Sequence, residues 1–384
     1  MRWQSLTAVT CALSALSALL GGCSAKHPSA VPPTPPTATA RPTAPTWTPP
    51  VRSPRLQVHV LDVNHGSATL IVTPSGEHAI LVDAGPRGAG YGAILPALDD
   101  RSFSFRAIDL MIITHYDADH IGGADEVIEA VPVDRLLDHG DHDHWLEAKG
   151  VQMEQYDAAM RAEPIPLDFD ITLDGVRVQC LASNNQTPFD TTEVAPDYGN
   201  DNPNSVALLV SWEGFEIYIA GDQTGSTEER LVDHVPDVDV FIMNHHGSSS
   251  KGSNSATLLN ALRPEVAIAS MGEHKGHQHP HHGPVDELVA LGADVYITNA
   301  NEHSVAALSV VEDRVLDNDP SGYDGAIVIE VDAETGQYTI EVGDARALPS
   351  YAFNEPGGAP ENASARLNLV KATTLERRLR RSQE

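Results

Sequence analysis

The sequence predicts an α/β fold of four layers, αββα, in which two mixed β-sheets pack together and helices cover the outer face of each. β-Hairpin signals occur near the beginning, in the middle and near the end of residues 55–345, and units of an apolar strand followed by a helical segment lie between them. Hairpins give antiparallel strand pairs and strand–helix units give parallel pairs, so a chain with both favours mixed sheets with helices outside.

The first half of this domain begins with a strand and a hairpin. Residues 56–63 alternate between apolar and polar side chains, and the apolar segments 68–72 and 78–83 are joined by a Pro-Ser-Gly turn. Residues 109–114 (DLMIIT) form an almost continuous apolar run, which is typical of a strand covered on both faces. The segment 124–131 (ADEVIEAV) predicts a helix.

The second half contains further hairpins and buried strands. Segments 206–212 and 215–220 predict a hairpin that turns at a Glu-Gly pair. Segments 238–243, 266–271 and 295–298 are apolar strands that alternate with Leu-bearing helical segments. Segments 326–331 and 338–342 predict a last hairpin that turns at Thr-Gly. Strands separated by helical segments predict parallel pairing in this part of the chain.

Composition limits the function. The chain has 24 Lys+Arg against 54 Asp+Glu, a formal charge of −30. Such a surface repels polyanions at long range, which disfavours a general nucleic-acid-coating role. It does not exclude a nuclease, because a divalent cation inverts the local potential within a cleft.

The three cysteines have different predicted roles. Cys11 and Cys23 lie in the first 23 residues, so Cys180 is alone in the folded part and no disulfide is expected there. Cys180 follows an alternating segment and is expected to be a small buried side chain on a strand.

Residues 1–23 predict a lipoprotein signal peptide. Arg2 precedes an apolar stretch at 8–20 that is short for a membrane span, and the segment ends in LGGC, which resembles the bacterial lipobox with Cys23 as the lipidated residue. The alternative is an ordinary signal peptide with an incidental cysteine. With Cys23 lipidated, the protein is expected to be exported and anchored to the bacterial cell envelope.

Segments of biased composition flank the predicted domain. Residues 24–54 are rich in Pro, Thr and Ala with little charge, and predict an extended linker. Residues 346–384 predict a low-complexity tail with a basic end, either a solvated tail or a short helix that contacts anionic lipid or nucleic acid.

The strongest chemical signal is the run HYDADH at 115–120. It follows a buried strand and supplies four metal-type side chains within six residues, namely His115, Asp117, Asp119 and His120. A loop at the end of a strand can direct His115 and Asp117 to one side and Asp119 and His120 to the other. Two sets placed in this way can hold two cations a few ångströms apart.

This run resembles the HxHxDH signature of the metallo-β-lactamase superfamily, and more closely the HxDxDH form found in the C-terminal domain of ComEC competence proteins. Further motifs of that group occur in the expected order over about 55–302. They are LDVNHGSA at 61–68 for LDVGQGDA, LVDAG at 81–85 for LxDxG, NPNSVAL at 202–208 for NNxSLVL, AGD at 220–222, HHGS at 245–248, and GHQHPH at 276–281 for GHPH.

The resemblance implies a role for each matching position. His115 and Asp117 are expected to hold a first ion, Asp119 and His120 a second, and Asp222 to bridge both. His279 is expected to complete the second site, with His277 as the alternative. His245 or His246 is expected to face the cleft as a proton donor or an oxyanion-stabilising group, and one of them remains open as a ligand.

Three departures from the family pattern affect these expectations. Asp117 stands where the signature has its second histidine, which favours Mn²⁺ or Mg²⁺ at one site. The third-motif histidine is replaced by the Asn204-Ser205 segment, so the first site is expected to be weak. His65 and Ser67 stand where the ComEC group has glutamine and aspartate, and His65 is expected to bond to backbone rather than reach the cleft.

One polar cluster lies outside these motifs. Residues 138–144 read DHGDHDH after a predicted strand at 133–137. Alternating Asp and His without fixed supporting groups predict a hydrated loop, with a metal-gathering or substrate-contacting loop as the alternative.

These features predict an extracytoplasmic metal-dependent hydrolase with one or two divalent ions, Zn or Mn. Water activated by the metal, with Asp119 and Asp222 beside it, is expected to attack a small-molecule or nucleic-acid phosphodiester. Lys251 and Lys275 are expected to meet the phosphate. The alternatives are a hydrolase of a lactone, thioester or β-lactam, and a non-catalytic lipoprotein that binds metal or a partner. No stable protein partner is inferable.

Overall fold

The computed structural model describes residues 54–100, 103–191, 193–272, 277–299, 314–317, 325–343 and 347–353. The predicted signal peptide with Cys23, nearly all of the linker and the basic end of the tail lie outside these residues. Within the described part of the chain, no helix is both long enough and apolar enough to cross a membrane.

The first sheet contains nine strands within the described residues, in the order β17-β16-β15-β1-β2-β3-β4-β5-β6. Their bounds are β1 (Leu56–Leu61), β2 (Thr69–Val72), β3 (Ala79–Val82), β4 (Leu110–Ile112), β5 (Leu136–Asp138), β6 (Glu163–Pro164), β15 (Ala326–Asp332), β16 (Gln337–Val342) and β17 (Ala347–Ala352). Strands β3 to β6 are parallel to one another, and the remaining neighbours are antiparallel.

The second sheet contains eight strands of the described chain, in the order β14-β13-β12-β11-β10-β9-β8-β7. Their bounds are β7 (Asp170–Leu173), β8 (Val176–Ala182), β9 (Ala207–Trp212), β10 (Phe215–Ile219), β11 (Val240–Ile242), β12 (Val266–Ala269), β13 (Asp294–Asn299) and β14 (Val315–Asp317). Strands β10 to β14 are parallel, and β7 to β10 form antiparallel pairs.

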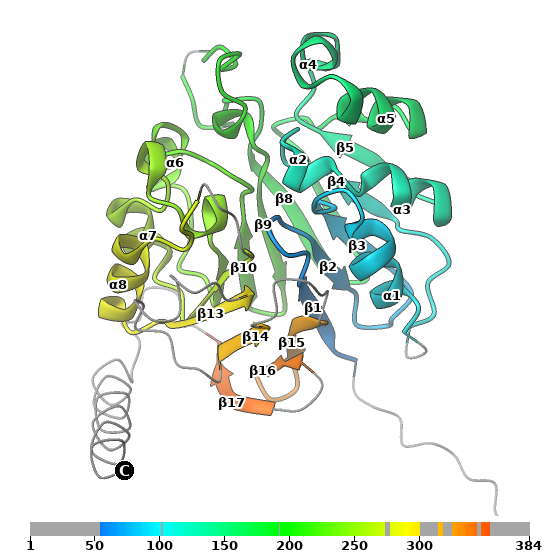
Figure 1. The fold of residues 1–384 in the computed structure, drawn as a ribbon. Coiled ribbons are helices and arrows are strands. Elements are labelled where there is room, and N and C mark those ends of the chain that lie inside the picture. Colours follow the sequence, from blue (N-terminus) through cyan, green and yellow to red (C-terminus); the bar gives the residue numbers. More distant parts are fainter. Residues whose placement is uncertain are drawn as a thin grey trace, which may run out of the picture. The chain divides into compact units, whose positions relative to one another are not determined.

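The helices lie on the outer faces of the two sheets (Figure 1). On the first sheet they are η1 (Gly90–Ile94), α1 (Leu95–Leu98), α2 (Ala118–Ile121), α3 (Ala124–Ala130), α4 (His142–Lys149) and α5 (Val151–Ala159). On the second sheet they are α6 (Gly225–Leu231), α7 (Ala256–Leu262) and α8 (His282–Leu291), and short helical turns η2 (Asn202–Asn204), η3 (Asn244–Gly247) and η4 (Ser250–Gly252) lie in loops.

Three apolar clusters separate these four layers. The central cluster joins the facing sides of both sheets, and includes Val58 from β1, Ile112 from β4 and Val210 from β9. The other two lie between each sheet and its own helices. Apolar side chains on both faces of β4 and β11 follow from this arrangement, since each strand is covered on two sides. The predicted αββα fold is confirmed.

The predicted strands and hairpins are present, with bounds that differ by at most three residues, and Cys180 lies buried on β8 as expected. The first sheet continues past residue 345, where the sequence predicted a tail. Strand β17 pairs with β16, and its Tyr351 is buried with its hydroxyl 2.8 Å from that of Tyr296. Small and polar residues around this short strand conceal it in the sequence.

The ends of several strands meet at one edge of the sandwich. The carboxyl ends of β3 and β4 lead to Asp83 and His115, and those of β10 and β11 lead to Asp222 and His246. Loops outside the carboxyl ends of parallel strands are the usual place for binding sites in α/β sheets. The fold therefore gathers the chemical motifs of both halves of the chain at this edge.

Candidate metal centre

Asp83 fixes the orientation of His120 in the HYDADH segment and of Thr114 just before it. Its carboxylate accepts hydrogen bonds from the Thr114 backbone N–H at 2.7 Å and from the Thr114 hydroxyl at 2.9 Å. It also lies 2.7 Å from Nδ1 of His120. A carboxylate only accepts, so Nδ1 of His120 carries a proton and Nε2 is the ring nitrogen directed at the site.

His115 and His246 are oriented in the same way. Nδ1 of His115 lies 3.2 Å from the Thr114 hydroxyl, whose own proton goes to Asp83, and Nδ1 of His246 lies 2.7 Å from the Ser270 carbonyl oxygen. The Thr114 hydroxyl oxygen and the Ser270 carbonyl oxygen each accept a hydrogen bond from the Nδ1–H of the ring that faces them. Each Nε2 is therefore left as a potential ligand, as in metal sites where an outer partner fixes the tautomer.

Asp222 lies among these imidazoles. Its Oδ1 is 3.2 Å from Nε2 of His120 and 3.5 Å from Nε2 of His246, and its Oδ2 is 3.9 Å from Nε2 of His115. One oxygen thus faces His120 and His246 while the other faces His115. This placement suits the bridging role that the sequence predicted for Asp222.

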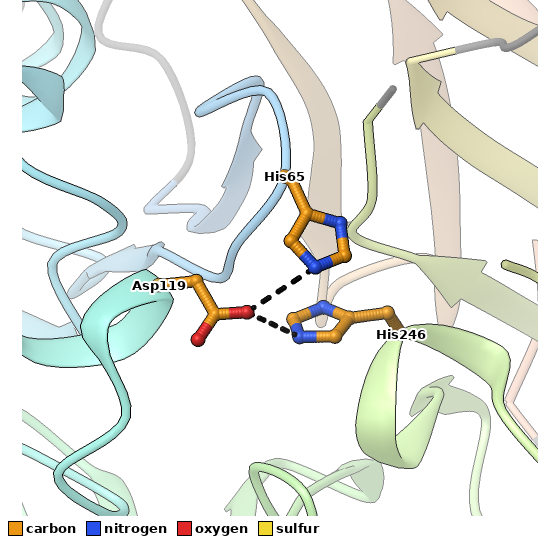
Figure 2. A group of neighbouring side chains, drawn as sticks. All are labelled: His65, Asp119 and His246. Carbon is orange, nitrogen blue, oxygen red and sulfur yellow. Dashed lines mark ion pairs between the residues drawn. The ribbon is translucent and has the colours of Figure 1, made fainter. Parts of the chain in front are cut away.

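The potential ligand atoms form two groups, each with its atoms within 4.8 Å of one another. His115, His120 and Asp222 form one group, and all three are buried. His65, Asp119 and His246 form the other (Figure 2). The structure thus groups His120 with His115, whereas the sequence predicted that His120 and Asp119 hold the same ion. It also places His65 and His246 in the group of Asp119.

The carboxylates and imidazoles of this cluster shift one another's pKa values. Burial alone raises the pKa of Asp119 and of Asp222, but the neighbouring imidazoles outweigh it and hold the pKa of each carboxyl below its usual value. Burial lowers the pKa of His120, yet Asp222 and Asp83 together raise it. The carboxylates therefore keep their negative charge at neutral pH.

Buried atoms without hydrogen-bond partners show that the cluster fits a cation. Nε2 of His115 and Oδ1 of Asp222 are buried, and neither forms a hydrogen bond of good geometry with a described residue. Buried polar groups are normally satisfied, and unsatisfied lone pairs that converge require a positive partner. Imidazole nitrogens with carboxylate oxygens are the ligand set that zinc and manganese accept.

Asp117 is placed differently from its neighbours. Its carboxylate forms an ion pair with Lys149 at the end of α4 and lies 3.5 Å from Nε2 of His115. Although burial opposes it, His115 and Lys149 lower the pKa of Asp117. Lys149 thus neutralises Asp117, the residue that stands in place of a family histidine, and no pattern in the sequence indicates this contact.

Asn202, two residues before the segment predicted to replace the third-motif histidine, lies beside Asp222. Its side-chain amide donates to Oδ2 of Asp222 at 3.2 Å, whereas Asn204 bonds to the Asp197 carbonyl and the Asp201 carboxylate. This hydrogen bond fixes the position of Oδ2 of Asp222, but the Asn202 amide does not supply the imidazole ligand that a histidine would.

His245 and His246 share an unusual backbone conformation. Their φ angles are 49° and 55°, a left-handed region that non-glycine residues rarely adopt. The resulting turn directs both rings at Asp222, with Nε2 of His245 at 3.6 Å from Oδ2. Strain of this kind concentrates at functional sites, in agreement with the predicted role of this pair.

His279 lies beside the two groups but in neither of them. Its ring is buried, and its centroid is 6.0 Å from that of His246 and 6.1 Å from that of His65. Burial and the nearby His246 and His245 lower the pKa of His279 to about 2. His277 is exposed. The ligand role of His279 stays a prediction.

The cluster lies at the base of a cleft of about 930 Å³. Among the described residues that line this cleft, Arg87 and Lys251 are the only Lys or Arg side chains. Lys251 is exposed and lines the cleft, as the sequence predicted. Lys275 lies outside the described residues. This acid-rich chain therefore places two positively charged side chains, Arg87 and Lys251, at the cleft.

The cluster at 138–144 is not a hydrated loop, so that prediction was wrong: residues 142–144 begin α4 and three of the cluster's side chains are buried. Asp138, His139 and His142 are buried. Asp138 binds Nε2 of His142 at 2.9 Å and the Tyr156 hydroxyl at 2.9 Å, and His139 pairs with Asp201 at 3.1 Å. Helices α4 and α5, which the sequence did not predict, cover these residues.

Comparison with known proteins agrees with this geometry. Residues 61–272, more than half of the chain, match the family model of the metallo-beta-lactamase superfamily. The chain belongs to this superfamily. Its members are usually metal-dependent hydrolases, and the motifs His115–His120, Asp222 and His245-His246 all lie within the matched residues.

The resemblance to ComEC-type competence proteins is also confirmed. ComE operon protein 3 of Bacillus subtilis is 26% identical over 266 residues, which are 64% of this chain and 32% of that protein. Recombination protein 2 of Haemophilus influenzae is 29% identical over 239 residues, which are 61% of this chain and 26% of that protein. The chain thus matches about a third or less of the length of these relatives.

Among solved structures, the chain is similar to a putative metal-dependent hydrolase of Parabacteroides distasonis, with 14% identity, a TM-score of 0.38, and coverage of 63% of this chain and 93% of that one. It is also similar to a metallo-β-lactamase fold protein of Bacillus subtilis, with 14% identity, a TM-score of 0.39, and coverage of 63% and 96%.

Proposed function

We propose that this chain is an extracytoplasmic, metal-dependent phosphodiesterase that acts on nucleic acid or a related phosphodiester. The observation that carries the proposal is the pairing, in one cleft, of two metal-ligand groups with the side chains of Arg87 and Lys251. A phosphodiester carries a negative charge, and Lys and Arg are the usual partners of phosphate. A neutral lactone or thioester does not require them.

The residues of the cleft have distinct parts in this proposal. His115, His120 and Asp222 hold one divalent ion, and Asp119 and His246 contribute to the other. Such ions activate water and stabilise developing negative charge on phosphorus oxygens. Burial is the main cause that lowers the pKa of His245, so its ring is neutral at pH 7 and Nε2 can exchange a proton beside Asp222.

The relatives support the substrate class by their names. Two of the matched proteins are a recombination protein and a competence protein, and recombination is a process of DNA. The net charge of −30 opposes tight capture of a polyanion, so we expect a high KM.

A substrate comparison tests the proposal. The full chain, loaded with Mn²⁺, is expected to cleave single-stranded DNA or a model phosphodiester and to leave a lactone and a thioester intact. Metal-loaded protein that ignores every phosphodiester but opens the lactone or thioester would assign the chain to that other class of hydrolase. Metal-loaded protein that is inert on all of them would indicate a binding protein.

The location outside the cytoplasm rests on the LGGC segment that ends at Cys23. We expect the full chain, produced in a bacterium, to incorporate labelled fatty acid and to fractionate with membranes. Each buried acyl CH₂ contributes about 0.8 kcal/mol, so two or more chains anchor a protein firmly. The Cys23→Ala variant should lose the label and leave the membrane fraction. A soluble, unlabelled wild-type protein contradicts lipid anchoring.

A further inference from the structure

The loop that carries His65 is fixed to both halves of the domain. Its Ser67 N–H donates to the Asp119 carbonyl at 3.0 Å, and its Gly66 carbonyl accepts from the Ser270 hydroxyl at 3.0 Å. These bonds join the loop after β1 to Asp119 in α2 and to Ser270 in the loop after β12. The position of His65 is therefore set relative to both sides of the cleft.

Two glycines permit this close packing. A Cβ at Gly66, where φ is +152°, would lie 2.5 Å from the Asp119 carbonyl oxygen. A Cβ at Gly272 would lie 2.6 Å from the His65 backbone nitrogen. Both distances are shorter than real Cβ contacts, so glycine at these positions lets the loop reach the metal centre from each side.

The distances around His65 match those between ligands of one ion. Nε2 of His65 lies 3.4 Å from Oδ2 of Asp119, and Nε2 of His246 lies 3.2 Å from the same oxygen (Figure 2). Ligands about 2.1 Å from an ion in tetrahedral geometry lie about 3.4 Å apart. Two imidazole nitrogens from separate parts of the chain therefore lie at coordination spacing from one Asp119 oxygen, and all three atoms lie within 4.8 Å of one another.

His246 is held so that one ring nitrogen faces Asp119. Nδ1 of His246 lies 2.7 Å from the Ser270 carbonyl oxygen. Nε2, on the other side of the ring, lies 3.2 Å from Oδ2 of Asp119. An imidazole nitrogen and a carboxylate oxygen directed at one point are ligands that a divalent ion can bind together, and Nε2 of His65 lies within reach of the same ion.

We propose that His65 is a metal ligand that, with Asp119 and His246, forms the second of two ion sites in the cleft. The inference rests on the metal centre of the proposed function, and it adds a ligand at the position where the ComEC motif has glutamine. An imidazole there replaces a weakly binding amide with a nitrogen ligand that suits zinc and cobalt. With His65, the second site has three protein ligands.

Cobalt spectroscopy of a cysteine variant tests the ligand directly. In the Co²⁺-loaded full chain, His65→Cys is expected to give a near-ultraviolet thiolate-to-cobalt charge-transfer band that the wild type lacks. Burial raises the pKa of the Cys180 thiol to about 12, so the native cysteine of the domain does not supply the thiolate. The matched control is His282→Cys, because His282 is exposed on α8 and does not line the cleft.

A titration of His65→Gln gives a second readout that does not depend on the new thiol. Loss of a supporting partner costs 10–100-fold in metal affinity, so loss of a ligand should weaken Co²⁺ binding at one of two sites by about 100-fold. The other site and the His282→Gln control should bind as the wild type does. Circular dichroism and thermal unfolding of the metal-free variants check that the fold is retained.

The outcomes separate the two proposals. If the wild type binds two Co²⁺ ions and both His65 variants bind them with no thiolate band and no loss of affinity, His65 is not a ligand although the metal centre stands. If the wild type binds no Co²⁺, both the metal centre and the His65 ligand are overturned.

Discussion

Replacement of His246 by alanine should reduce phosphodiester hydrolysis by the full chain on the order of 10³-fold or more, the size of loss seen when one member of a catalytic unit is removed. Nε2 of His246 lies within 3.5 Å of Asp119, Asp222 and His120, so its loss disturbs both ligand groups. A chelator should abolish the same activity, and added Mn²⁺ should restore it in the wild type but not in the variant.

The control for this prediction is His282→Ala, which removes an exposed histidine on α8 outside the cleft. It should keep wild-type kcat and KM. Initial rates with a chromogenic phosphodiester give both constants. An unaltered rate in His246→Ala, or hydrolysis that survives chelation, is incompatible with catalysis at this cluster.

Replacement of Asp222 by alanine should remove at least one bound metal ion and lower the thermal stability of the metal-loaded protein. Asp222 belongs to the group with His115 and His120 and also lies 3.5 Å from His246 of the other group, so it links the two groups. Metal at about a hundred times its Kd stabilises a folded protein by roughly 3 kcal/mol. Its loss should lower Tm by about 6–12 °C for a domain of this size.

Asp117→Ala is the matched comparison, because Asp117 is a carboxylate of the same segment that pairs with Lys149 and stands in neither ligand group. It should lose less metal and less Tm than Asp222→Ala. The metal-free forms of wild type and Asp222→Ala should differ less in Tm than the loaded forms. Equal metal content and equal Tm in loaded wild type and Asp222→Ala would show that Asp222 is not a shared ligand.

The elements of the fold were predictable because their signals are local. Alternation in β1, the turn between β2 and β3, and the apolar run of β4 each report burial on one or both faces. Helices α4 and α5 were missed because their exposed faces are polar and their buried residues are few. Strand β17 was missed because its burial depends on β16, which no local pattern reveals.

The site was predictable where residue types cluster in sequence, and less so where loops meet in space. HYDADH, Asp222 and the HH pair carry family motifs, and the structure brings them together. The approach of His65 to Asp119 depends on the Ser67 and Ser270 hydrogen bonds, and Lys149 reaches Asp117 only through α4. Such contacts follow from tertiary packing, and spacing along the chain does not encode them.

Metal content of the full wild-type chain tests the central claim most directly. Two ligand groups, one of which contains Asp222 in contact with His246 of the other, predict two divalent ions per chain after reconstitution with Zn²⁺ or Mn²⁺ and removal of free metal. Elemental analysis with a parallel protein assay gives the ratio, and the Asp222→Ala variant should bind fewer ions. A folded wild-type protein that retains no divalent ion under these conditions would contradict the assignment of this cleft as a metal centre.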